Sequence, residues 1–278
     1  MTSRRRVAAA QRRSVALCTR TLAAVWLLAA VSASPLAAQT DYYNTSTGRP
    51  LRIEDALPVE FRAIELNFAP IRWERAPNAT YRWSLDPEVA VGVLPRTQIQ
   101  IGVPLSFIDG QSTSARGVAG LEVAVMHTLN AETSIPAFAL SGDVLLPVGS
   151  VAADAAYGTL KGILTRTTRI ARVHANAQFT LGPTPGESDG EVADVEASRW
   201  LAGIAVDKAL PLRSILFSVE GFAEQPLDSS AELEWNAGAG ARVQLSPRWA
   251  FDAGVGRRLT GARAWSVTFG SAYAVGIP

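Results

Sequence analysis

Two histidines are the side chains in this sequence best suited to acid–base chemistry. His174 lies on the polar face of a stretch in which polar and apolar residues alternate, whereas His127 falls on the apolar face of another such stretch. A hydrolytic site would need a serine, a histidine and an acid within hydrogen-bond reach. Ser141 and Asp143 share a polar face, but nothing in the sequence brings them near His174. We therefore predict an ordinary polar histidine and no enzymatic activity.

Metal and phosphate chemistry have little support in the sequence. The single cysteine is Cys18, and the two histidines are not spaced as a ligand set. Glu232 and Glu234 share a face and could bind Ca²⁺ weakly, although a solvated wall explains them more simply. The Gly-x-Gly pairs at 238–240 and 254–256 lie in strand patterns, so they fit sheet curvature or the close approach of another segment better than a phosphate loop. We predict no cofactor and no metal.

Alternation with a period of two organises the chain from residue 61 onward. Its clearest example is Glu88–Phe107, EVAVGVLPRTQIQIGVPLSF, in which two alternating runs meet at Leu94-Pro95-Arg96. Side chains alternate between the faces of a strand, so each run predicts a strand, and the short connection predicts a hairpin. The second apolar run is about ten residues long, which is the length of a tilted membrane-spanning strand. Its predicted lipid contacts are Ile99, Ile101 and Val103.

About twelve such strands follow one another along the chain. Short turns near residues 95, 130, 169, 211 and 247 alternate with connections that are mostly longer, at 109–116, 147–157, 182–196, 224–231 and near 261. Short periplasmic turns and longer outer loops are typical of outer-membrane barrels, and tryptophans near strand ends fit an interfacial belt. We predict an all-β fold, a closed antiparallel up-and-down transmembrane β-barrel of about 12 strands over residues 60–278, in the outer membrane of a Gram-negative cell. A soluble secreted β protein is the alternative.

The N-terminal part of the chain has a different character. Residues 1–38 combine an arginine-rich start, the apolar run Thr21–Val31 and small residues up to Ala38, which predicts a cleaved signal peptide rather than a retained anchor. Residues 39–59 lack alternation and predict an N-terminal periplasmic arm, a segment tucked into a barrel mouth, or a flexible leader. Cleavage would remove six arginines and leave 20 basic and 25 acidic residues, a net charge of −5. That charge argues against nucleic acid as a partner.

The polar faces of the strands are predicted to line the lumen. The candidate lumen residues are Arg96, Gln98, Gln100, Glu122, Asp143, Lys161, Arg172, His174, Asn176, Gln178, Arg199, Asp207, Glu220, Glu232, Glu234, Arg242 and Asp252. They carry both signs of charge, so they could cross-link and close the lumen, or form opposed walls along a narrow polar channel.

Several stretches resemble known outer-membrane proteins. The last strand, Thr268–Val275, resembles their C-terminal insertion signal, which implies the barrel-assembly machinery and outer-membrane lipids as partners. Arg52–Ala56, the Leu94-Pro95-Arg96 hairpin and Leu160–Arg166 resemble the transporter-like barrels grouped with the meta-pathway phenol-degradation proteins. That resemblance implies a channel or transporter for small molecules, including hydrophobic or aromatic compounds. A closed structural or interaction barrel that acts through its outer loops is the alternative, and a barrel hydrolase is a distant third.

Overall fold

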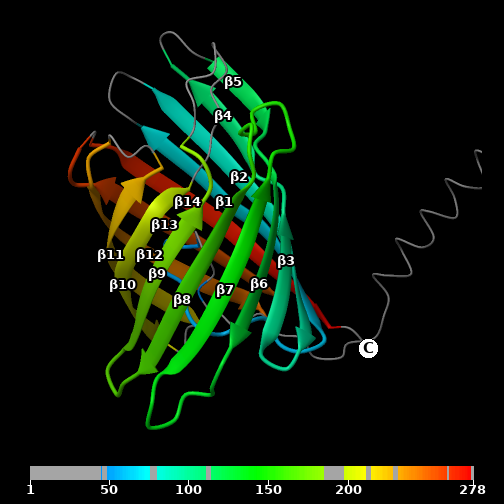
Figure 1. Cartoon of the computed structure of the whole chain (residues 1–278). Coiled ribbons are helices and arrows are strands. Elements are labelled where there is room, and N and C mark those ends of the chain that lie inside the picture. The colour runs from blue at the N-terminus through cyan, green and yellow to red at the C-terminus, as the bar shows by residue number, and fades with distance from the viewer. Residues whose placement is uncertain are drawn as a thin grey trace, which may run out of the picture. The chain divides into compact units, whose positions relative to one another are not determined.

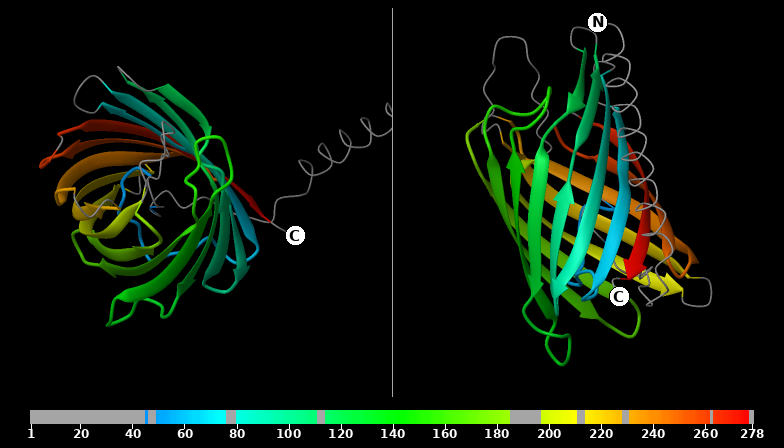
Figure 2. Two further views of the ribbon diagram at one scale, coloured as in Figure 1. Left: turned by 45° about the horizontal axis from the view of Figure 1, so that its top comes forward. Right: turned by 90° about the vertical axis from the view of Figure 1, so that its right-hand side faces the viewer.

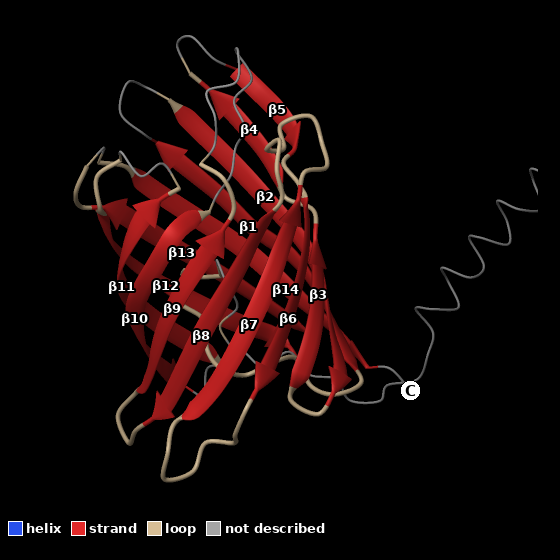
Figure 3. Ribbon diagram, viewed as in Figure 1, coloured by secondary structure: helices blue, strands red, loops and turns tan. Residues whose placement is uncertain are grey.

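The computed structural model describes residue 45 and residues 49–75, 80–110, 114–184, 197–210, 214–227, 231–261 and 263–276. The predicted signal peptide lies outside the described residues, as do the turn at 211–213 and most of the loop predicted at 182–196. All regular secondary structure in the described part is strand (Figure 3). No helix there is long and apolar enough to span a membrane.

The strands all belong to one antiparallel sheet. They are β1 (Ala63–Arg75), β2 (Tyr81–Leu94), β3 (Thr97–Gly102), β4 (Leu105–Asp109), β5 (Ser114–Val118), β6 (Leu121–Thr128), β7 (Ala137–Leu146), β8 (Tyr157–Thr167), β9 (Arg172–Leu181), β10 (Ser198–Leu210), β11 (Ile215–Pro226), β12 (Glu234–Ser246), β13 (Trp249–Arg258) and β14 (Trp265–Gly276). The sheet closes because β1 pairs with both β14 and β2. The resulting ring is seen from one end in Figure 2.

Two of the barrel strands are each interrupted once, so fourteen segments make twelve strands. β2 pairs with β4 along its first half and with β3 along its second half, and β3 and β4 are separated only by Val103 and Pro104. Proline cannot donate to a ladder, which explains the break. β5 and β6 are likewise separated by only two residues, Ala119 and Gly120, neither of which is a proline. The predicted closed antiparallel up-and-down barrel of about twelve strands is confirmed.

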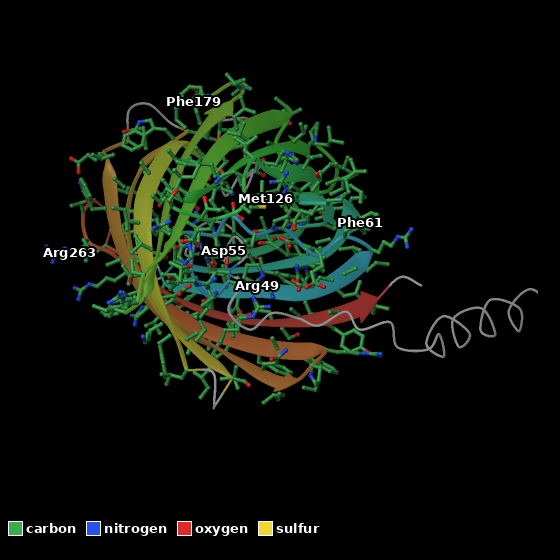
Figure 4. All side chains as sticks on the ribbon, turned by 90° about the horizontal axis from the view of Figure 1, so that it is seen from below. Arg49, Asp55, Phe61, Met126, Phe179 and Arg263 are labelled. Carbon is green, nitrogen blue, oxygen red and sulfur yellow. The ribbon has the colours of Figure 1, made fainter. Side chains whose placement is uncertain are left out.

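The outer surface of the barrel is apolar. Large side chains such as Ile204, Phe217 and Val255 are more than half exposed at mid-strand positions. Figure 4 shows Phe179 on the outside of the ring, whereas Arg49, Asp55 and Met126 lie within it. An apolar exterior around a polar interior is the arrangement of a membrane-spanning barrel. The predicted localisation in the outer membrane agrees with this fold.

Part of the sheet extends beyond the rim on the side of the longer loops. β4, β5 and the adjoining ends of β1 and β2 project there (Figure 1). The connection between β7 and β8 lies against the end of β5, where Val151 N donates to Val118 O at 3.1 Å. This contact pairs one carbonyl group at the sheet edge. We call this end of the barrel the loop end and the opposite end the turn end.

Arginine substitutions on the outer face should show the depth of the lipid band. Ile204→Arg, at the middle of β10, should destabilise the barrel by about 2–4 kcal/mol, because it buries a charge at mid-membrane depth. Leu245→Arg, next to the end of β12, should cost about 0–1 kcal/mol. Urea unfolding in lipid vesicles measures both. Equal costs at the two positions would contradict a lipid-facing band.

Candidate functional site

Residues 49–60, here called the inner segment, run inside the barrel along its wall. The segment lacks regular secondary structure, so wall side chains satisfy its backbone groups. Glu220 Oε2 accepts hydrogen bonds from Arg52 N and Ile53 N, both at 2.9 Å. Near the other end of the segment, Val59 N donates to Gln98 Oε1 at 2.7 Å. The segment is therefore tied to strands on opposite parts of the sheet order, β11 and β3.

The middle of the inner segment is held by amide and hydroxyl groups. Asn176 accepts from Glu54 N through Oδ1 and donates to Glu54 O through Nδ2, both at 2.9 Å. Ala56 N donates to Thr165 Oγ1 at 2.9 Å, and Thr128 Oγ1 donates to Ala56 O at 2.6 Å. Donors and acceptors of this stretch are thus matched by β6, β8 and β9.

Charged side chains of the inner segment form ion pairs with the wall. Lys161 Nζ lies 2.6 Å from Glu54 Oε1. Arg172 lies 3.6 Å from Asp55, and Arg52 lies 3.7 Å from Glu224. Arg49, which is 1% exposed, lies 3.4 Å from Glu65 and 3.5 Å from Asp252. Because a buried charge is costly unless it is paired, these contacts fix the position of the segment as well as neutralising the wall.

Apolar contacts and glycines complete the fit between segment and wall. Ile53 packs with Leu201, Ala205 and Phe222, and Ala56 lies in a cluster with Met126 and Ile163. Pro50 lies against β12 and β13: a Cβ atom at Gly240 would stand 2.7 Å from Pro50 Cβ, and one at Gly254 would meet its carbonyl oxygen. These two glycines therefore permit the close approach of another segment, which is one of the two explanations that their strand context offered.

His174 belongs to a buried network beneath the inner segment. Its Nδ1 lies 2.9 Å from Thr165 Oγ1 and its Nε2 lies 2.9 Å from Asp207 Oδ2. Arg172 also holds Asp207, through contacts at 3.0 and 2.7 Å. Thr165 Oγ1 accepts a hydrogen bond from Ala56 N, so the hydroxyl hydrogen of Thr165 is available to donate to His174 Nδ1. The imidazole then carries its hydrogen on Nε2, and His174 Nε2–H donates to Asp207.

This order of hydroxyl, imidazole and carboxylate resembles a nucleophile, base and acid, but the contacts are structural. Thr165 is 2% exposed and its oxygen already bonds the inner segment, so no substrate reaches it. Ser141 pairs with Lys161 in the sheet register, four positions along β8 from Thr165. Among the described residues, no group of three or more His, Cys, Asp or Glu side chains is arranged to hold a metal ion.

Cavities remain on both sides of the inner segment. The loop-side cavity, of about 180 Å³, is bordered by Glu54, Glu88, Glu122 and Asp143. A rim cavity of about 220 Å³ adjoins it and shares Arg52 in its lining. The turn-side cavity, of about 50 Å³, lies at the start of β1 and the end of β14. Four residues line both the loop-side and the turn-side cavity: Glu54, Gln98, Gln100 and Met126.

The predicted lumen residues divide into groups by their contacts. Those that bond the inner segment, line a cavity or belong to the buried networks are Gln98, Gln100, Glu122, Asp143, Lys161, Arg172, His174, Asn176, Gln178, Asp207, Glu220, Glu234, Arg242 and Asp252. The prediction that Arg96 and Glu232 line the lumen is wrong. Arg96 lies in the exposed turn between β2 and β3, and Glu232 is exposed and precedes β12. Arg199 lies beside a bulge between Ser198 and Trp200 and donates to Thr180 O and Gly182 O at the strand end.

Sequence reasoning missed the threonines that hold the inner segment. Thr128, Thr165 and Thr268 each hydrogen-bond its backbone, the last through Pro50 O at 3.0 Å. Thr165 shares a face with Lys161 and pairs with His174, so continuing the alternation of β8 would have found it. Thr128 and Thr268 carry no comparable signal, because threonine suits either face of a strand.

Comparison with known proteins supports the fold alone. No family model matches the sequence, and no curated protein matches it. Two similar solved structures are the KdgM porin, 11% identical over 75% of this chain and 98% of that chain, and the COG4313 outer membrane channel from Pseudomonas putida F1, 10% identical over 77% and 94%. Both have a TM-score of 0.50. The chain therefore has the fold of outer-membrane channel barrels.

Loss of the carboxylate at Glu220 should release part of the inner segment. Glu220→Ala leaves Arg52 N and Ile53 N without acceptors, which costs roughly 1–3 kcal/mol for each group. We expect trypsin to cleave the folded variant after Arg52, a bond that is protected in the wild type. Glu232→Ala, which removes an exposed carboxylate, serves as the control. Protection in both variants would show that Glu220 does not anchor the segment.

Proposed function

We propose that this protein is an outer-membrane channel through which small solutes pass beside the inner segment without displacing it. The observation that supports this route is the shared lining of the loop-side and turn-side cavities by Glu54, Gln98, Gln100 and Met126. These residues border the space between the inner segment and the wall around β3 and β6. The fold shared with outer-membrane channels is consistent with such a role.

The lining of the route favours polar solutes. Carboxylate, amide and guanidinium groups border the loop-side cavity, including Glu88, Gln178 and Arg72. The family resemblance suggests hydrophobic or aromatic compounds instead, but desolvating so many polar groups against an apolar solute would be unfavourable. We therefore propose small polar molecules as the transported class.

A closed structural barrel is the second candidate, and the dense bonding of the inner segment favours it. Conductance in planar bilayers separates the two candidates. A disulfide between Ile53→Cys and Leu201→Cys would fix the segment to β10, because the two side chains pack together. The only cysteine of the sequence, Cys18, lies in the predicted signal peptide. We expect the locked barrel to conduct like the wild type, and deletion of residues 50–58 to increase conductance.

Each alternative gives a different result in this experiment. A wild-type barrel that does not conduct, with a deletion variant that does, would identify the inner segment as a closed plug. Conductance that falls when the disulfide forms, and returns on reduction, would show that the segment must move. The proposed route requires conduction in both the oxidised and the reduced protein.

The acidic side of the loop-side cavity should make conduction selective for cations. The Glu122 side chain borders the cavity together with the carboxylates of Glu54 and Asp143, which outnumber the nearby ammonium group of Lys161. Glu122→Gln should therefore lower the ratio of cation to anion permeability, measured as a reversal potential in a KCl gradient. Glu232→Gln removes the same charge from an exposed position and should change the ratio little. Equal shifts in both variants would contradict the assigned route.

A further inference from the structure

Arginine and aromatic side chains form a belt on the outer face of the barrel near the loop end. In the sheet register Arg257 pairs with Trp265, Trp265 with Arg75, and Arg75 with Tyr81. This row therefore crosses β13, β14, β1 and β2 in turn. The side chains are outward, since Trp265 is 53% exposed and Arg75 and Arg257 are exposed.

A second row lies beside the first on the same face. Trp73 pairs with Trp83, Trp83 with Phe107, and Phe107 with Arg116. Trp83 and Phe107 are 49% and 43% exposed. We call the two rows the outer belt; its members are Arg75, Arg116, Arg257, Trp73, Tyr81, Trp83, Phe107 and Trp265.

Two guanidinium groups of the belt form cation–π contacts with its aromatic rings. Arg257 Cζ lies 4.7 Å from the centre of the Trp265 ring, and Arg75 Cζ lies 5.9 Å from that of Tyr81. Among the residues that the structure describes, no carboxylate forms an ion pair with Arg257, Arg75 or Arg116, the three arginines of the belt.

Three basic side chains at the turn end are bonded to other groups of the protein. Arg166 pairs with Glu132 at 3.6 Å, Arg96 donates to Leu129 O at 3.4 Å, and Lys208 donates to Ile170 O. These three groups find partners within the protein. A fourth turn-end arginine, Arg62, lies 5.3 Å from the centre of the Phe61 ring and resembles the belt arginines in this contact. What distinguishes the belt is the register that brings Arg257, Trp265, Arg75 and Tyr81 into one continuous row.

We propose that the outer belt binds the phosphate groups of a phosphorylated glycolipid in the outer leaflet. Tryptophan and tyrosine belts lie at headgroup level, and guanidinium binds phosphate in a bidentate manner. Neighbouring strands are about 4.8 Å apart, so Arg257 and Arg75, on strands separated by β14, are about 10 Å apart along the sheet. That spacing fits a headgroup that carries two phosphates. The proposal depends on the orientation of the barrel in the outer membrane and not on conduction.

Binding of diphosphorylated lipid A to the purified full-length barrel in neutral detergent tests this proposal. The triple variant Arg75→Gln, Arg116→Gln, Arg257→Gln should bind the lipid roughly 100-fold more weakly, at about 1 kcal/mol per basic residue. Wild-type protein should bind dephosphorylated lipid A about as weakly as the triple variant binds the phosphorylated form. The shift of the folded band on an unheated gel verifies that each variant forms a barrel.

The matched control removes three arginines from the turn end, Arg62→Gln, Arg96→Gln and Arg169→Gln. All three are exposed, and their loss changes the net charge by the same amount. The proposal requires that this control binds the lipid like the wild type. Equal weakening in the two triple variants, undiminished binding by the belt variant, or equal binding of dephosphorylated lipid by the wild type would overturn it.

Discussion

Hydrogen bonds from the backbone of residues 49–60 to side chains of the inner wall determine how the interior of this barrel is arranged. A segment without regular structure brings unpaired N–H groups into a confined space, and each would cost roughly 1–3 kcal/mol if it remained unsatisfied. Glu220, Asn176, Thr165 and Gln98 supply acceptors from β11, β9, β8 and β3. The wall gains as well, because Glu54 and Asp55 of the segment neutralise Lys161 and Arg172.

The same contacts fill one part of the lumen and leave cavities in another part. Wall charges of opposite sign are partly cross-linked, as around Asp207, and partly exposed to cavities, as at Glu122. Cross-linked charges and polar cavities thus occur in different parts of one lumen. On the outer face, apolar and basic side chains are clearly separated. Apolar side chains face lipid at mid-strand positions, and arginines with aromatic rings lie at the loop end.

The architecture could be predicted from the sequence because the alternation of polar and apolar residues indicates which face of a strand each side chain occupies. Prediction from alternation was less accurate where a strand is locally irregular. The bulge beside Arg199 and the turn at Arg96 break the period of two. The interruption of the strand at Pro104 leaves no break in the alternation. The inner segment could not be placed, because its polar backbone could be satisfied by many surfaces. Gly240 and Gly254 gave the one local indication that another segment approaches the wall.

Hydrogen exchange of individual amides in the wild-type barrel, embedded in lipid, tests the central claim most directly. The amides of Arg52, Ile53, Glu54, Ala56 and Val59 donate to wall side chains, so they should exchange as slowly as amides within the strands. Exchange of these five amides at the rate of an exposed loop would contradict an inner segment fixed to the wall.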